Sequence, residues 1–92
     1  TVFPLPDDVQ NFTGGGGETP VNFQTNLSLD EVIEFYRAAF AEQGLTERTL
    51  LTVISDTTFS IVFDGSPNGQ AIVVQGVDLG AGINVNIRFE NI

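Results

Sequence analysis

The sequence predicts an α+β fold in which a single helix packs on one face of a four- to five-stranded antiparallel sheet. The expected order of elements along the chain is β-α-β-β-β-β. Two observations lead to this prediction. First, one segment has a helix start, an apolar helical face and a helix end. Second, the runs around this segment are strand-like and are joined by short stretches of turn-forming residues. Connections this short favour antiparallel neighbours.

The chain is expected to divide into an extended N-terminal arm or linker, residues 1–19, and a single α+β domain, residues 20–92. Pro4 and Pro6 favour extended backbone in the arm. The arm also holds several apolar residues, among them Phe3 and Val9, which a fully solvated linker does not need. Part of the arm is therefore expected to lie against the domain.

The helix is expected within residues 26–45. Ser28 stands three residues before Glu31, which is the spacing of a capping box, and Gly44 can end the helix in the left-handed conformation. Apolar residues between these signals recur at helical spacing and predict the face that packs on the sheet. This face comprises Leu29, Val32, Ile33, Tyr36, Ala39 and Phe40.

Five runs are strand-like: residues 20–25 before the helix, and 45–55, 57–64, 70–78 and 82–91 after it. Apolar residues alternate with polar ones in several of these runs, so alternate side chains are expected to point toward the helix. The expected inward sets are Val21 and Phe23; Phe59, Ile61 and Phe63; and Ile83, Val85, Ile87 and Phe89.

The glycine run 14–17 is not expected to bind a phosphate. A Walker-type loop carries a lysine directly after its glycines, and a dinucleotide-binding fingerprint leads into a helix. Here Glu18 follows the glycines and a strand-like run comes next. The run is therefore expected to be a flexible joint.

The composition argues against nucleic acid binding, membrane insertion and catalysis. The chain has twelve acidic residues and three arginines, which gives a net charge of −9, and it has no lysine, histidine or cysteine. Nucleic acid binding is not expected, because it needs a basic surface, and no run is apolar and long enough for direct membrane insertion. The usual catalytic bases and the most reactive nucleophiles are missing, so the chain is not expected to be an enzyme.

Residues 64–69 leave calcium binding open. Asp64, Ser66 and Asn68 stand at alternate positions, as the first ligands of a calcium loop do, but the terminal glutamate of such a loop is missing. A hairpin turn explains the same residues. No cofactor is predicted for the chain.

The sheet face opposite the helix is the candidate interaction face. Its members are expected to be Val62, Val73 and Val77 with Thr58, Gln75 and Arg88, a half-apolar set that can bind another protein or a second copy of the chain. Valine and threonine are also favoured on strands for their β propensity alone. The predicted sheet edges carry no lysine, so strand addition is possible as well.

The segment "TNLSLDEVIEFYRAAFAEQGLTERT", residues 25–49, resembles a segment of uncharacterised bacterial envelope proteins, cyanobacterial ones among them. In those proteins a helix with the pattern "sl-x-e-v-x-x-F-Y-r" ends in a glycine followed by an apolar residue, and a run of strands comes next. The resemblance implies a non-enzymatic module with a periplasmic or extracellular location, and it supplies no functional residues.

The leading hypothesis is a non-enzymatic binding or interaction module of unknown ligand. The chain begins at Thr1 and has no methionine, and it is expected to be part of a larger envelope or secreted protein. Two alternatives stay open. One is a hydrolase that acts on carbohydrate through two carboxylates converging in one pocket. The other is a structural terminal domain of an envelope-spanning transducer that binds its partner by strand addition.

Overall fold

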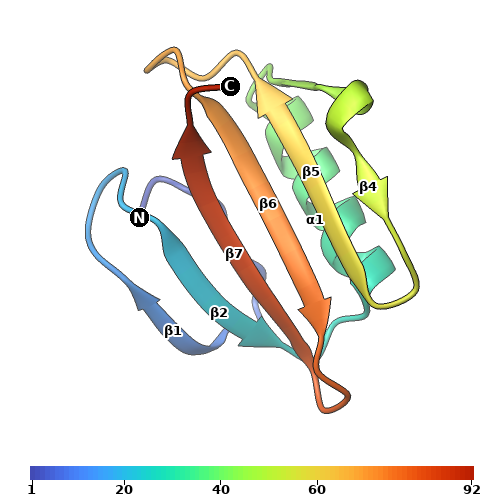
Figure 1. Ribbon diagram of the computed structural model, residues 1–92. Helices are drawn as coiled ribbons and strands as arrows, with labels where there is room; N and C mark the ends of the chain where they lie inside the picture. Colours follow the sequence, from blue (N-terminus) through green and yellow to red (C-terminus); the bar gives the residue numbers. More distant parts are fainter.

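The computed structural model describes residues 1–92, and it places one helix against one antiparallel sheet (Figure 1). The helix is α1 (Leu29–Glu42). The strands are β1 (Gln10–Gly14), β2 (Val21–Thr25), β3 (Thr46–Glu47), β4 (Val53–Ile54), β5 (Thr58–Asp64), β6 (Ala71–Asp78) and β7 (Ile83–Glu90), with a short 3₁₀ helix (Thr49–Leu51) between β3 and β4. The α+β fold with a single helix is thus confirmed.

The sheet has seven strands in the order β1-β2-β7-β6-β5-β3, and β4 also pairs with β5. The last strand, β7, lies between β2 and β6, so the two halves of the chain are joined at the middle of the sheet. In Figure 1, α1 lies behind the side of the sheet that contains β5, and β1 forms the opposite edge.

The expected number of four to five strands was too low, for two reasons. First, β1 lies within residues 1–19, which the sequence predicts to be an arm or linker. Second, the run 45–55 is not one strand but β3, the 3₁₀ helix and β4 in succession. The backbone turns between the two short strands, where the N–H of Arg48 donates to the carbonyl of Val62 at 2.7 Å.

The ends of α1 follow the sequence signals closely. The Ser28 hydroxyl accepts a hydrogen bond from the Glu31 N–H at 3.1 Å, and the Glu31 carboxylate accepts one from the Ser28 N–H at 3.0 Å. Gly44 has a φ of +82°, and the Leu45 N–H donates to the carbonyl of Phe40 at 3.0 Å. The capping box and the Schellman-type end are therefore both present.

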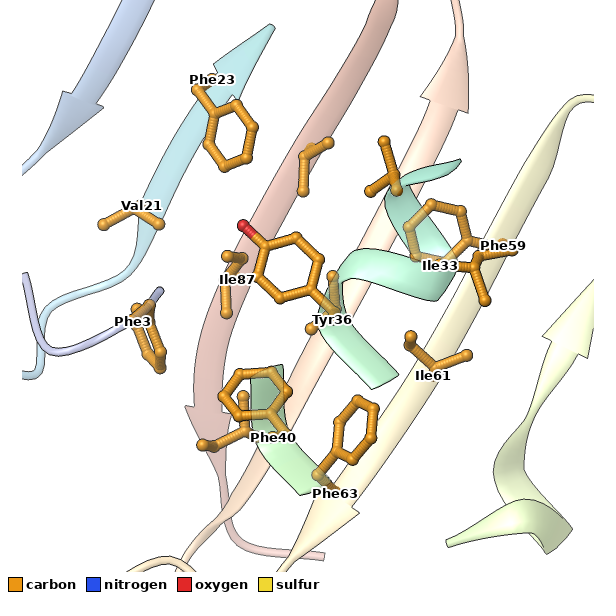
Figure 2. Packing of buried hydrophobic residues seen from close by; sticks show 14 of the residues in the cluster. Phe3, Val21, Phe23, Ile33, Tyr36, Phe40, Phe59, Ile61, Phe63 and Ile87 are labelled. Carbon is orange, nitrogen blue, oxygen red and sulfur yellow. The ribbon is translucent and has the colours of Figure 1, made fainter. Parts of the chain in front are cut away.

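The main core lies between α1 and the sheet (Figure 2). Tyr36 and Phe40 from α1 stack with ring centroids 5.7 Å apart, and Phe40 packs on Phe63 of β5 at 4.8 Å. The expected inward residues of β2, β5 and β7 are buried, apart from Phe89, which is half-buried and packs on the core. The hydroxyl of Tyr36 is buried without a hydrogen-bond partner.

The start of the chain also belongs to this core. Phe3 is buried, and its ring centroid lies 5.0 Å from that of Phe89. The N–H of Val2 donates to the carbonyl of Gly17 at 3.1 Å, which ties the beginning of the chain to the β1–β2 hairpin. The glycine run 14–17 therefore forms the tip of a hairpin against which the first residues rest.

Candidate interaction surfaces

The face of the sheet opposite α1 carries a network of amides around Arg88. The Arg88 guanidinium donates to the side-chain oxygens of Gln75 at 2.8 Å and Asn86 at 3.0 Å. Asn22 and Asn84 exchange two amide hydrogen bonds, at 3.0 and 3.1 Å. These groups satisfy one another, so this part of the face is polar and internally bonded.

Two of the three valines predicted for this face are buried. Val62 and Val73 are only 4% and 3% exposed, and with Ala71 they form a second, small buried cluster. Thr58 is exposed, Val77 is 42% exposed, and Gln75 and Arg88 are half-buried. A partner approaching this face would meet mainly amides and hydroxyls, and binding at this face stays a prediction.

Asp64 borders the small cluster and is held by Arg48. Two guanidinium nitrogens of Arg48 donate to the two Asp64 oxygens at 2.8 and 2.6 Å, and this pairing lowers the pKa of the Asp64 carboxyl. In the same loop, the hydroxyl of Ser66 lies 2.7 Å from the Asn68 side-chain oxygen. The oxygens considered for calcium at residues 64–69 are thus engaged by groups of the chain itself.

Four aliphatic side chains gather at the sheet edge that β4 forms. We call Leu50, Leu51, Val53 and Ile54 the edge strip. Their side chains are 96%, 40%, 62% and 49% exposed, and all four lie within five consecutive residues. This surface is not predicted when residues 45–55 are interpreted as one strand of the sheet. The available signal was a stretch from Thr49 to Ser55 without any charged residue and without alternation.

The backbone of β4 is unpaired on its outer side. The Ser55 N–H donates to the Thr58 carbonyl at 2.9 Å, so residues 55 and 58 form a hydrogen-bonded pair at the β4–β5 turn. Ile54 faces Phe59, one position further along. Because bonded and non-bonded pairs alternate in antiparallel sheets, the N–H and C=O of Ile54 point away from β5. The edge therefore offers backbone groups as well as apolar side chains.

The opposite edge differs in character. All five residues of β1 are exposed, most of them are polar, and the pairing with β2 is irregular between Gln10 and Thr13. Asn11 has a φ of +52° within this irregularity, and its amide donates to the Gln24 side chain at 2.7 Å. The β1 edge thus has the bulged, polar form that discourages further strand pairing.

A hollow of about 490 Å³ opens beside the edge strip at the start of α1. Three carboxylates line it, Asp30, Asp56 and Asp78, and Ile54 of the edge strip forms part of its wall. We call it the acidic hollow. No group of three or more acidic side chains in the chain is placed so that it could hold a metal ion. The hollow is thus a negatively charged surface continuous with the apolar strip.

A second, more apolar pocket of about 240 Å³ lies where the first residues of the chain meet the end of α1. Phe3, Phe40 and Phe89 are among its lining residues. Pockets for small organic ligands are commonly about 300–1,000 Å³, so this one is small for such a ligand.

Every arginine of the chain is paired internally. Arg37 binds Glu47 at 2.8 Å, and Arg48 binds Asp64 at 2.6 Å. Arg88 lies 3.4 Å from a carboxylate oxygen, that of Glu90. These pairs engage three of the twelve acidic residues, which leaves nine carboxylates without an arginine partner. The three carboxylates of the acidic hollow are among these nine.

Comparisons of the chain with protein-family models, with curated proteins and with solved structures found no match. The single helix, α1, is too short to cross a membrane.

Proposed function

We propose that this chain is a non-enzymatic interaction module that binds an extended segment of another protein at the edge strip. The observation that carries the proposal is the exposure of four neighbouring aliphatic side chains at an unpaired sheet edge. Isolated exposed apolar residues are ordinary, but four exposed aliphatic side chains within five consecutive residues favour a binding surface. Val53 pairs with Ser60 and Ile54 with Phe59, so the strip presents apolar side chains on both faces of the edge.

The size of the strip sets the scale of the interaction. Full burial of one Leu, Val or Ile side chain contributes about 1.5–3 kcal/mol, so covering the exposed parts of Leu50, Leu51, Val53 and Ile54 would contribute on the order of 4–7 kcal/mol. Association itself costs about 4–15 kcal/mol. The apolar contact alone therefore supports weak binding, and a stable complex needs further contacts nearby. The outward N–H and C=O of Ile54 supply one such contact, as in strand addition.

The location that accompanies this proposal is the periplasm or the cell exterior of a bacterium. It is supported by the resemblance of residues 25–49 to segments of bacterial envelope proteins. The absence of lysine, histidine and cysteine supports the non-enzymatic part of the proposal, because the common catalytic bases and nucleophiles are missing.

A peptide selection tests the proposal. A displayed library of random nine-residue peptides is selected against the wild-type chain, and the enriched peptides are measured against Leu50→Asp and Val2→Asp. Leu50 is 96% exposed, so its substitution leaves the fold intact, and Val2 is an exposed aliphatic control beside the β1–β2 hairpin. We expect Leu50→Asp to weaken peptide binding at least tenfold and Val2→Asp to leave it unchanged. A selection without enriched peptides, or peptides that bind Leu50→Asp as well as wild type, would refute the proposal.

A further inference from the structure

The edge strip and the acidic hollow form one continuous surface. Ile54 belongs to both, and the chain runs from the strip directly through Ser55 into Asp56 of the hollow. Any segment that lies along β4 therefore has aliphatic side chains beside most of its length and carboxylates beside one end.

The electric field at that end is negative. Asp30, Asp56 and Asp78 face the hollow, and the N-terminus of α1 offsets them by only about half a positive charge. Glu31 and Glu34 lie on the adjoining exposed surface of α1 and add to the same sign. The three arginines that could neutralise this region are bound to Glu47, Asp64 and Glu90.

We propose that the segment bound at the edge strip is a basic, apolar one: a short extended stretch with Leu, Ile, Val or Phe residues, bounded at one end by a lysine or arginine that enters the acidic hollow. This inference rests on the proposed function and specifies the chemistry of the partner. The apolar residues cover Leu50, Val53 and Ile54, and the cation meets carboxylates that have no arginine partner within the chain.

The spacing follows from strand geometry. Ile54 faces the inward residue Phe59 and so lies on the α1 face of the sheet. Because side chains alternate between the two faces of a strand, a cation on the α1 face stands an even number of residues beyond the position that faces Ile54. The acidic hollow is lined from the α1 side of the sheet, by Leu29 and Asp30, and the cation therefore projects from the α1 face of the bound segment. In a segment antiparallel to β4, the cation lies toward the segment's N-terminus. In a parallel segment, the cation lies toward the segment's C-terminus.

Charge also decides against a second copy of this chain as the occupant. Each copy has a net charge of −9 and brings the same acidic surroundings to the edge strip. Like charges would therefore meet at a shared interface, and their repulsion acts over the Debye length of about 10 Å at 0.1 M salt.

The experiment uses synthetic nine-residue peptides taken from the selection described above, each with its basic residue retained or replaced by glutamine. Their affinities are measured by fluorescence anisotropy for wild type, for the variant Asp30→Asn/Asp56→Asn/Asp78→Asn, and for the control Asp7→Asn/Glu18→Asn/Glu42→Asn. The control removes the same number of charges outside the hollow. Both variants are first compared with wild type by circular dichroism and urea unfolding.

We expect the triple variant of the hollow to bind the basic peptides about tenfold more weakly, and the control to change affinity by less than threefold. Replacing the basic residue should weaken binding to wild type about tenfold and leave binding to the hollow variant unchanged. Raising NaCl from 50 to 500 mM should abolish most of this difference.

The outcomes separate this inference from the proposed function. If peptides depend on Leu50 but not on the hollow carboxylates, the interaction module stands and the basic partner is wrong. If no peptide depends on Leu50, both fail. If sedimentation shows a wild-type dimer that Leu50→Asp dissociates, the occupant is a second copy, and the basic partner is again wrong.

Discussion

Substitution of Gly76 by alanine tests the packing of the central strands most directly. Gly76 lies in β6 opposite Phe59 of β5, and the Phe59 ring covers it. A Cβ at position 76 would stand 2.2 Å from Cε2 of Phe59 and 2.8 Å from Cδ2 and Cζ. Phe59 is buried in the main core, so the ring has to shift against its neighbours to make room.

The expected loss of stability follows from two opposing effects. Overpacking a core costs about 1–3 kcal/mol, while replacing an interior strand glycine by alanine regains about 0.5–1 kcal/mol. The free energy of unfolding should therefore fall by roughly 1.5 kcal/mol, and the melting temperature by about 6–12 °C for a domain of this size. Urea unfolding followed by circular dichroism measures the change.

A double-mutant cycle shows whether the Phe59 ring is the cause. In a Phe59→Leu background the clash is removed, and Gly76→Ala should become neutral or slightly stabilising, with a coupling energy of about 1 kcal/mol or more. Gly16→Ala serves as the control, because nothing lies within 4 Å of a Cβ at that position. A Gly76→Ala variant as stable as wild type, or an effect that is the same in both backgrounds, would contradict a clash with the Phe59 ring.

Two further predictions concern ionisable groups. Tyr36→Phe should leave stability unchanged or raise it by up to about 1–3 kcal/mol, because the deleted hydroxyl is buried without a partner. Burial raises the pKa of Tyr36 well above its ordinary 10.0, so its titration leaves stability unchanged below pH 10. Stability falls as the pH rises from 10 toward the folded value, because only the unfolded chain ionises there. Tyr36 is the sole tyrosine, and ultraviolet titration should detect tyrosinate only when the chain unfolds; tyrosinate in a folded chain near pH 10 would contradict this. The hydrogen bond from Arg37 lowers the pKa of Glu47 below its ordinary 4.5, so that pair stabilises the fold above pH 4.5 and ceases to do so as the pH falls through the lower folded value. The stability difference between wild type and Glu47→Gln should therefore shrink from pH 7 to pH 3 in urea unfolding experiments, and a constant difference would argue against this pair.

Local signals made the helix predictable from the sequence. Ser28, Glu31 and Gly44 act on backbone groups within a few residues of themselves, so the start and the end of α1 can be read without knowledge of the rest of the fold. The inward faces of β2, β5 and β7 were predictable for a related reason. Alternation along a strand directly reports which side is buried.

The missed strands depend on distant partners. β1 is exposed along its whole length and is held by backbone bonds to β2, so it has no alternating pattern to reveal it. The break between β3 and β4 is the 3₁₀ turn at Thr49–Leu51, and the residues on each side of it pair with β5, a separate run of the sequence. Alternation also placed Val62 and Val73 on the face opposite α1, but it carries no information on what covers them there.

The two edges of the sheet explain how a chain without lysine can expose an apolar strip. β1 is polar and bulged at Asn11, and β4 offers only two paired residues before a turn, so neither edge is a long regular template for another copy. The net charge of −9 acts in the same direction, because copies that approach through the strip bring like charges together. The same charge attracts a cationic segment and steers its approach. The features that would keep copies of this chain apart are therefore the ones that, under the proposal above, would leave the edge strip open to a basic partner.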